Sequence, residues 1–577
     1  MKRFVPLLAL LLLSCATPGA DPASAPVPAY DLVIRGGQIL DGSGSAPFAG
    51  DLAIKGDRIV AVGKVAGRGV QEIDAAGLAV SPGFINMLSW SGETLIADGR
   101  GLSDLKQGVT LEVMGEGSSM GPWNPEMIAQ ETARQGDIKY PITWTTLGGY
   151  LEAMEARGVS INVASMIGAE TARTWVLGEG DVDPDAAQLD TMKGLVKQAM
   201  EEGALGVGSS LIYAPGGYAE TDELAALASV AGRCGGIYAS HMRYESDRLL
   251  DGIDELIEIS RRSGAPAEIW HLKQAGKTNW GKLDAAIARI EAARAQGLRI
   301  TANMYSYTAG STGFDAAMPP WVQAGGREAW INRLKDPAVR AKVIAEIRDP
   351  AAPYENLYRH AGAEGTIMVG FRSEALKPLT GSTLAAVAKH RGQSPEDAMI
   401  DLVIADGSRI QVVYFLMSED NVRRQTSLPW MSFGSDASAL APEGIFLKSS
   451  THPRAYGNFA RVLGKYVRED RALTLADAVH RLSGLPAHNL GLKDRGLLKP
   501  GYMADVVVFD PVTVADHATY DSPRQFATGI RQVVVNGGWV LKDGEPTEVR
   551  SGRFVRGRAW TGWADGGCRA KASDWNW

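Results

Sequence analysis

Cysteine and histidine are both scarce in this sequence. Among 577 residues there are 3 cysteines and 8 histidines, and no histidine precedes His241. One cysteine stands in the N-terminal apolar segment, so only Cys234 and Cys568 remain for the folded part of the chain. Two cysteines exclude a disulfide framework of the kind that holds small secreted domains together. One disulfide bond between these two cysteines remains possible, but nothing else in the sequence supports it.

An excess of positive charge, low-complexity tracts and internal repeats are also missing. The formal net charge of −7 excludes the basic footprint of a nucleic-acid-binding protein. The lack of a repeat period of about 20–50 residues argues against a solenoid. Hydrophobic residues make up 45% and charged residues 22% of the chain, as in an ordinary globular protein. A chain of this length is expected to form one large domain and a smaller one.

Long apolar runs are confined to the N-terminus. Residues 4–13 follow Lys2 and Arg3, and this run is too short to span a bilayer but suits the core of a signal peptide. Residues 12–15, Leu-Leu-Ser-Cys, resemble a bacterial lipobox, in which Cys15 would be acylated and become the mature N-terminus. The alternative is an ordinary secretory signal with an incidental cysteine.

The first 29 residues are therefore predicted to direct export rather than to fold. Residues 1–15 form the expected lipoprotein-type signal peptide, and residues 16–29, rich in Pro, Ala and Ser, the expected disordered tether. We expect a protein on the periplasmic side of a bacterial cell envelope, whose membrane contact is the lipid on Cys15. Without acylation it would be secreted to the periplasm.

Strand-like segments lie at both ends of the remaining chain. Residues 30–82 alternate apolar and polar side chains between glycine-containing turns, and the same texture returns in residues 497–550. The second block contains Asn536-Gly537, a strong hairpin pattern. The two blocks are predicted to pair into one small β-sandwich domain, followed by a tryptophan-rich tail at 551–577 for which the sequence offers no account.

The middle of the chain, residues 83–496, alternates strands with amphipathic helices. Eight alternations predict an α/β fold, specifically a (β/α)8 barrel. One long insertion, about 308–430, is expected to cover the barrel mouth as a lid. The expected strands lie near residues 83–87, 109–115, 161–168, 204–210, 236–242, 267–273, 299–307 and 431–437.

Candidate metal ligands stand at the ends of these strands, where such barrels carry their chemistry. His241 and His271 end the fifth and sixth strands, and they are 30 residues apart, about one β-α-β unit. Glu116 follows the second strand and Asp436 ends the eighth. Two imidazoles and a carboxylate leave a fourth position for water, as in catalytic zinc sites. Taken singly, each residue could instead bond a neighbouring loop or form a turn.

Several short motifs give a more specific indication. The segments "YASHMR", "IWHLK", "GSDAS", "HPRAYG" and "LKPGYMADVVVFDP" resemble the D-aminoacylase (N-acyl-D-amino-acid deacylase) family of the amidohydrolase superfamily. The resemblance covers about residues 30–545. It implies a metal-dependent (β/α)8 barrel with a small β-sandwich that hydrolyses the amide bond of N-acyl-D-amino acids.

The resemblance also implies roles for single residues. His241 and His271 match the two histidines of the tightly bound metal, and Asp436 matches the general base, which later acts as the acid. Glu116 falls where the family usually has a bridging cysteine, in a loop that is shorter here.

The substrate's carboxylate has its own matching positions. Arg454 and Lys273 match residues that hold this carboxylate in the family, and Tyr305 or Tyr307 is similar to a tyrosine with the same task. The expected partner is accordingly a small N-acyl-D-amino acid or a short peptide with a D-residue, and no nucleic acid.

The first barrel strand departs from the family pattern. Relatives have "GFIDxHxH" where this chain has "GFINMLSW", so Leu88 and Trp90 replace two histidines of a second, weaker metal site. We therefore expect one divalent ion, zinc, and not two. A chain that lacks ligands could be an inactive binding protein, but the retained Asp436, Arg454 and Lys273 favour activity.

Two other enzyme classes are open. Residues 117–121 match the G-x-S-x-G pattern of serine hydrolases, with Ser119 as the nucleophile. A nucleophile elbow turns directly into a helix, whereas Pro122 and Pro125 predict a loop here. A D-residue dipeptidase or another amide hydrolase of the same superfamily is not distinguished from a deacylase by the sequence.

Overall fold

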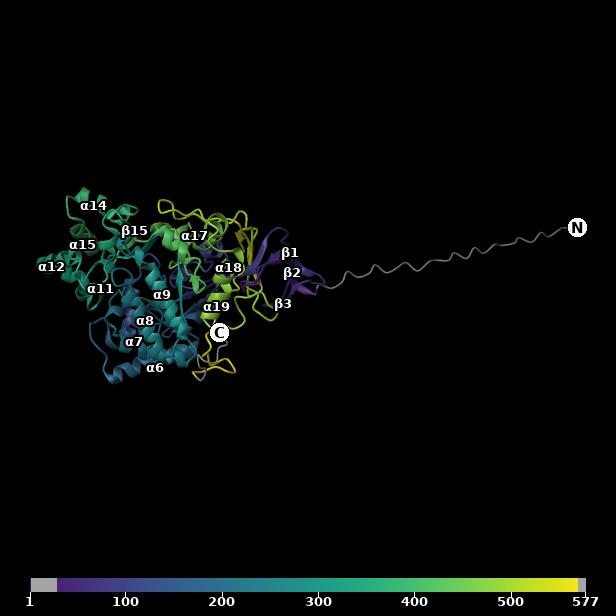
Figure 1. Ribbon diagram of the computed structural model, residues 1–577, viewed down its shortest axis with the longest axis horizontal. Coiled ribbons are helices and arrows are strands. Elements are labelled where there is room, and N and C mark those ends of the chain that lie inside the picture. Colours follow the sequence, from purple (N-terminus) through teal and green to yellow (C-terminus); the bar gives the residue numbers. More distant parts are fainter. Residues whose placement is uncertain (2–28, 569–577) are drawn as a thin grey trace.

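The computed structural model describes Met1 and residues 29–568. The described chain is elongated, with a β domain at one end, the barrel in the middle and the insertion at the other end (Figure 1). The predicted signal peptide, the acylation site Cys15, nearly all of the tether and the last nine residues of the tail lie outside the described residues. No helix within the described part is long and apolar enough to cross a membrane.

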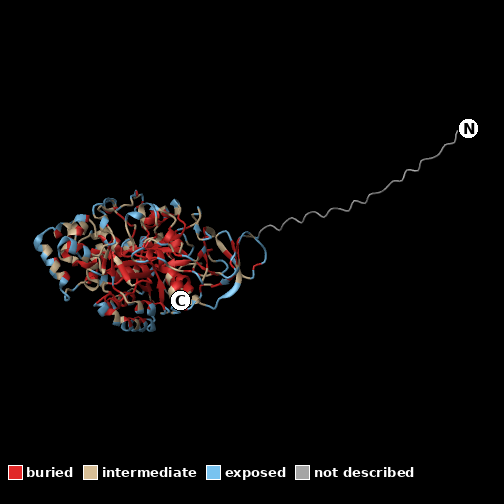
Figure 2. Ribbon diagram, turned by 90° about the horizontal axis from the view of Figure 1, so that it is seen from above, coloured by how far each residue is buried: buried red, intermediate tan, exposed pale blue. Residues whose placement is uncertain are grey.

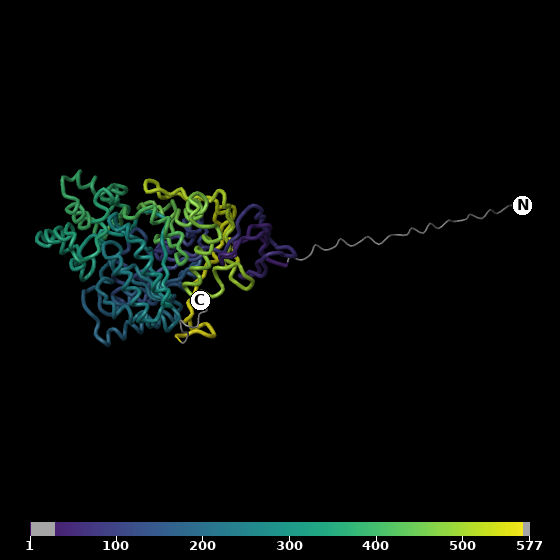
Figure 3. The backbone as a smooth tube through the Cα atoms, viewed as in Figure 1, coloured from purple at the N-terminus to yellow at the C-terminus, as the bar shows by residue number. Residues whose placement is uncertain are grey.

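Strands from both chain ends form one mixed sheet. Its order is β21-β20-β19-β18-β5-β1-β2-β3, with β4 paired to β1. The two blocks meet where β5 pairs antiparallel with β18, and in Figure 3 part of the yellow segment lies beside the purple one. The strands are β1 Tyr30–Ile39, β2 Phe48–Lys55, β3 Arg58–Gly63, β4 Gly69–Asp74, β5 Ala79–Pro82, β18 Val506–Phe509, β19 Ile530–Val535, β20 Gly538–Lys542 and β21 Glu545–Pro546.

The hairpin predicted from Asn536-Gly537 joins β19 and β20. Both residues have positive φ, 47° for Asn536 and 80° for Gly537, as a two-residue turn that follows the twist of its strands requires. The small β domain expected from the two ends of the sequence is thus confirmed.

Parallel strands form the barrel. The strands run in two sheets, β6-β7-β8 and β9-β10-β11-β12-β13-β17. The Met87 amide donates to the Phe433 carbonyl (3.2 Å) and the Leu205 amide to the Ser165 carbonyl (3.0 Å), so hydrogen bonds close both seams. The strands are β6 Phe84–Asn86, β7 Val109–Met114, β8 Asn162–Ser165, β9 Ile167–Gly168, β10 Gly206–Ser210, β11 Ile237–His241, β12 Ala267–Ile269, β13 Ile300–Met304 and β17 Met431–Phe433.

Helices surround this barrel, as expected for the fold. Helix α8 buries Ile253, Leu256 and Ile257 against the strands and ends on the exposed Arg261 and Arg262, which suit the negative end of the helix dipole. Figure 2 shows that buried residues are concentrated in the barrel. The α-helices outside the insertion are α1 Thr94–Ala97, α2 Leu102–Leu105, α3 Pro125–Arg134, α4 Leu147–Arg157, α5 Ala169–Leu177, α6 Ala186–Glu202, α7 Thr221–Arg233, α8 Leu249–Ser263, α9 Leu283–Ala295, α17 Arg454–Arg461, α18 Leu475–Val479 and α19 Leu485–Asn489.

The insertion after β13 has a core of its own. Its three antiparallel strands are in the order β14-β16-β15, and Trp330, Met399 and Tyr414 are buried among its helices. Its elements are β14 Ala309–Gly313, α10 Pro320–Gln323, α11 Gly326–Leu334, α12 Pro337–Arg348, α13 Leu357–Ala361, β15 Thr366–Gly370, α14 Leu384–Arg391, α15 Pro395–Asp406, β16 Gln411–Phe415 and α16 Glu419–Gln425.

The C-terminal segment returns to the barrel. Phe554 forms a parallel bridge with Val163 of β8 and is 3% exposed. A disulfide bond then joins Cys568 to Cys234, the residue that follows α7. The sequence offered no support for this bridge because nothing in a pair of cysteines 334 residues apart reveals that they meet in space.

Candidate metal centre

Two histidines and one glutamate converge at the mouth of the barrel. His241 is the last residue of β11, His271 follows β12 and Glu116 follows β7. Glu116 Oε1 lies 3.0 Å from His241 Nδ1 and 2.9 Å from His271 Nε2. All three side chains are buried, and one ligand atom from each lies within 4.8 Å of the others. The structure therefore brings together the three ligands predicted from the strand ends.

The backbone at His271, just after strand β12, has an unusual conformation. Its φ is 37°, in the left-handed region that a non-glycine residue seldom adopts. The His271 amide donates to the Asn303 side-chain oxygen at 2.8 Å. This bond from the neighbouring strand secures a conformation that costs energy, which is a common feature of functional sites.

A second carboxylate, Glu245, lies close to the outer nitrogens of both rings. Its Oε2 is 3.3 Å from His241 Nε2 and its Oε1 is 3.1 Å from His271 Nδ1. Metal-binding histidines commonly donate their outer N–H to such a carboxylate, which fixes the tautomer and the ring orientation. Glu245 was not predicted, since a glutamate four residues after His241 in a loop follows no spacing rule.

This donor set fits a divalent metal ion. Two imidazole nitrogens and one carboxylate oxygen are the ligands that zinc takes in catalytic sites. Burial disfavours the charged form of Glu116, but His271 and His241 hold the pKa of its carboxyl below the usual range. Burial opposes ionisation of Glu245 as well, yet His241 and Lys273 keep the pKa of that carboxyl well below normal. Both carboxylates are thus charged, as a cation site requires.

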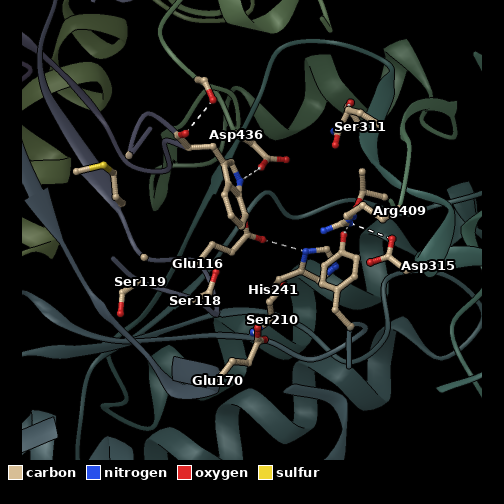
Figure 4. A pocket seen from close by; sticks show the side chains of 18 of the residues that line it. Glu116, Ser118, Ser119, Glu170, Ser210, His241, Ser311, Asp315, Arg409 and Asp436 are labelled. Carbon is tan, nitrogen blue, oxygen red and sulfur yellow. Dashed lines mark hydrogen bonds and ion pairs between the residues drawn. The ribbon is translucent and has the colours of Figure 1, made fainter. Parts of the chain in front are cut away.

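Asp436 lies beside this cluster, between one hydrogen-bond donor and one cationic side chain. Trp90 Nε1 donates to its Oδ1 at 3.1 Å, and Arg454 Nη1 lies 2.8 Å from its Oδ2. Burial raises the pKa of Asp436, and the charge of Arg454 opposes that rise. In Figure 4, Asp436 lies above Glu116, which in turn faces His241.

The residues predicted to hold a carboxylate differ in their placement. Arg454 is 3% exposed, and its guanidinium lies 4.5 Å from the centre of the Tyr305 ring. Lys273 Nζ is 2.7 Å from Glu245 Oε1, so part of its charge is already balanced. Both Arg454 and Tyr305 line the cavity. Tyr307 is a correction: its hydroxyl donates to Asp516 at 3.1 Å and the ring is absent from the cavity wall.

The cavity above the cluster has a volume of about 720 Å³. The barrel side contributes apolar side chains, such as Trp123 from the loop before α3 and Tyr150 from α4. The insertion contributes two arginines, Arg327 and Arg409, of which Arg409 lies 3.1 Å from Asp315. Glu170 lies on the barrel side, where burial raises the pKa of its carboxyl to about 8. No sequence motif predicts that these charged residues line the cavity: Arg327, Arg409, Asp315 and Glu170.

The two positions that depart from the family differ in exposure. Leu88 is 1% exposed and belongs to the apolar filling of the barrel, whereas Trp90 is 43% exposed at the cavity wall. Neither side chain carries a group that binds zinc.

Ser119 lacks the surroundings of a nucleophile. Its hydroxyl donates to the Gly121 carbonyl and accepts from the Gly168 amide, and no described histidine bonds to it. The chain continues as a loop until α3 begins at Pro125. This is not the strand-to-helix turn of a nucleophile elbow.

Comparison with known proteins places the chain in a family. The profile of the amidohydrolase family matches residues 71–541. The chain is 34% identical to N-acyl-D-glutamate deacylase of Alcaligenes xylosoxydans xylosoxydans over 91% of this chain and 96% of that protein.

Solved structures agree. N-acyl-D-glutamate deacylase of Bordetella bronchiseptica, in complex with zinc and a phosphonate mimic of the tetrahedral intermediate, matches with a TM-score of 0.75 and 30% identity, over 91% of this chain and 99% of that one. A D-aminoacylase with a binuclear metal centre matches equally well, again at 0.75 and 30%, over 91% and 100% of the two chains. This protein is therefore an amidohydrolase acting on C–N bonds, and it belongs to the D-aminoacylase, or N-acyl-D-amino-acid deacylase, family.

Proposed function

We propose that this enzyme is an N-acyl-D-amino-acid deacylase that works with one divalent metal ion, zinc. The single observation that carries the proposal is the convergence of Glu116, His241 and His271 on one point at the base of the cavity, beside Asp436. The relatives' activity on N-acyl-D-amino acids supports the substrate class.

The residues have separable tasks. Glu116, His241 and His271 would hold the ion, and Glu245 orients the two rings. A bound ion of this kind supplies Lewis acidity, which polarises a carbonyl group and lowers the pKa of water. Asp436 accepts the proton of the attacking water and later gives it to the departing amine.

The substrate's carboxylate would bind at Arg454 and Tyr305. The Arg454 Nε and the Tyr305 hydroxyl are buried, and neither has a hydrogen-bond partner among the described residues. Leaving such donors unmatched costs about 1–3 kcal/mol each, so a carboxylate that reaches them would be favoured. Lys273 adds a positive charge from behind His271.

An acidic side chain on the substrate is supported by Arg327. This residue lines the cavity and makes no hydrogen bond or ion pair within the described part of the chain. By contrast, Arg134 pairs with Glu179 and Arg409 with Asp315. We therefore infer that Arg327 meets a carboxylate on the ligand. Arg327→Gln should lower kcat/KM for N-acetyl-D-glutamate more than for N-acetyl-D-leucine.

For its location we propose the cell envelope, with Cys15 acylated. The bond between Cys234 and Cys568 supports this, because disulfides persist in oxidising compartments such as the periplasm. Mass spectrometry of the mature N-terminus tests it. A diacylated or triacylated Cys15 is expected, and an uncleaved or unlipidated N-terminus in the membrane fraction would contradict it.

The activity is tested by a substrate screen with a matched variant. Zinc-loaded protein is assayed with N-acyl-D- and N-acyl-L-amino acids and with D-residue dipeptides, the remaining alternative. We expect turnover of the D-acyl compounds and a loss of at least about 100-fold in kcat for Asp436→Asn with its zinc content unchanged. Zinc binding without turnover of any substrate would indicate a binding protein. Turnover of the dipeptides alone would indicate a dipeptidase.

A further inference from the structure

Trp90 stands where the first strand would otherwise supply a metal ligand, and its indole reaches Asp436. The Trp90 Nε1 donates to Asp436 Oδ1 at 3.1 Å. Trp90 is 43% exposed, although a tryptophan that only filled space would be expected in the apolar core.

Hydrogen bonds link the loop after β6, which carries Trp90, to the loop after β17, which carries Asp436. The Trp90 amide donates to the Ala437 carbonyl at 3.1 Å, and the Asp436 amide donates to the Leu88 carbonyl at 2.9 Å. The Ser438 hydroxyl donates to the Trp90 carbonyl at 2.8 Å. Because hydrogen bonds run in both directions between the loops, the backbone of Trp90 is fixed relative to that of Asp436, and the indole reaches the carboxylate from a defined position.

The carboxylate of Asp436 has a hydrogen bond on one oxygen and an ion pair on the other. Arg454 approaches Oδ2 at 2.8 Å and Trp90 approaches Oδ1. The last torsion of an aspartate is broad, so a donor on one oxygen alone leaves the plane of the carboxylate free to rock. The directional bond from Trp90, together with the ion pair to Arg454, restricts that plane.

We propose that Trp90 is a positioning residue, which orients Asp436 for proton transfer in place of any group bound at the first strand. This inference depends on the proposed function in one respect, the role of Asp436 in proton transfer. The indole suits the position because its N–H donates but carries no charge and binds no zinc. It therefore holds the carboxylate without competing for the ion.

Kinetics of Trp90→Phe test the catalytic consequence. Phenylalanine keeps an aromatic wall and removes the N–H. We expect kcat to fall by about 10- to 100-fold, the usual effect of losing a partner that orients a site residue, with KM changed by less than about threefold and zinc content unchanged. Trp144→Phe is the control, because it also loses one indole bond, to the Met120 carbonyl at 2.7 Å, away from Asp436. A kcat for Trp90→Phe within about twofold of the parent would overturn the proposal.

A second measurement needs neither metal nor turnover. In protein labelled with ¹⁵N-tryptophan, the Trp90 indole signal is identified by its loss in Trp90→Phe. Asp436→Ala should shift this signal and speed its solvent exchange, and should leave the Trp144 signal in place. An unmoved Trp90 signal would show that the bond is not formed in solution and would sink the proposal. If the parent enzyme hydrolyses none of the substrates but this shift occurs, the proposed function fails while the contact stands.

Discussion

Glu245 lies directly behind His271, with its Oε1 3.1 Å from Nδ1 of the imidazole. The same carboxylate reaches His241 Nε2 at 3.3 Å through its other oxygen, and Lys273 Nζ balances its charge at 2.7 Å. One buried carboxylate thus lies against the outer nitrogens of both rings, whose inner nitrogens face Glu116. The geometry of the metal cluster depends on a residue that is not itself a ligand.

Replacing Glu245 by glutamine should weaken zinc binding by about 10- to 100-fold. The amide keeps the size of the side chain but loses the negative charge that lies beside both imidazole rings. Competition with a chelating dye measures the change. Glu255→Gln, which breaks an ion pair with Arg243 at 3.0 Å, is the control and should keep the parent affinity. Unchanged zinc affinity in Glu245→Gln would contradict this role.

The number of bound ions is the next prediction. Leu88 and Trp90 offer no zinc ligand, so we expect one equivalent of zinc per chain by elemental analysis after dialysis. The double variant Leu88→His/Trp90→His should take up a second equivalent, since it supplies two imidazoles beside Asp436. A parent protein that holds two tightly bound equivalents would show that the first strand is not needed for a second ion.

The strand-end residues could be predicted because the fold itself places them. Parallel strands of a closed barrel deliver their C-terminal ends to one rim, so His241, His271, Glu116 and Asp436 were expected on the same rim once the strands were assigned. Nothing comparable constrains a loop. Glu245 follows the same strand as His241, but the turn that directs it back to both rings leaves no pattern in the sequence.

The choice between Tyr305 and Tyr307 shows a related limit. Both follow β13 and lie on the same side of an extended chain, so alternation could not separate them. The separation comes from Asp516, which lies far along the chain and takes the Tyr307 hydroxyl. Contacts of this kind, like the Cys234–Cys568 bond, belong to the tertiary structure and have no local signature.

Two buried carboxyl groups near the first strand make stability dependent on pH. Asp104 and Glu112 are both 0% exposed. Burial raises the pKa of both, and the negative charge of Glu112 raises that of Asp104 further. At intermediate pH the folded protein retains protons on these two carboxyl groups that the unfolded chain has released. Their contribution to the free energy of unfolding is therefore complete below their unfolded pKa values and is lost as the pH rises toward their folded pKa values.

Asp104→Asn should therefore gain stability relative to the parent as pH rises. The amide is neutral at every pH, and its oxygen can still accept from Asn86 Nδ2, which donates to Asp104 at 2.8 Å. We expect the difference in free energy of unfolding to grow by about 1 kcal/mol or more between pH 4 and pH 8, measured in urea. Glu374→Gln on the surface should show no such trend, and a pH-independent difference for Asp104→Asn would rule out a raised pKa for Asp104 in the folded protein.

The disulfide between Cys234 and Cys568 is expected to stabilise the fold by holding the end of the chain. It joins residues 334 positions apart, and a cross-link that closes a long loop reduces the entropy of the unfolded chain. Cys568→Ser should lower the free energy of unfolding by about 2–5 kcal/mol. The serine replaces the less buried partner, since Cys234 is 1% exposed and a hydroxyl there would add a desolvation cost of its own.

Chemical reduction of the Cys234–Cys568 bond distinguishes the effect of losing the disulfide from the effect of the Cys568→Ser substitution itself. Dithiothreitol should lower the stability of the parent to that of Cys568→Ser and leave the variant unchanged, as read from urea unfolding. Zinc content and kcat should be retained in both, because the bond lies by α7 while the metal cluster is at the mouth of the barrel. If the reduced parent unfolds at the same urea concentration as the oxidised one, the bridge does not hold the C-terminal segment to the barrel.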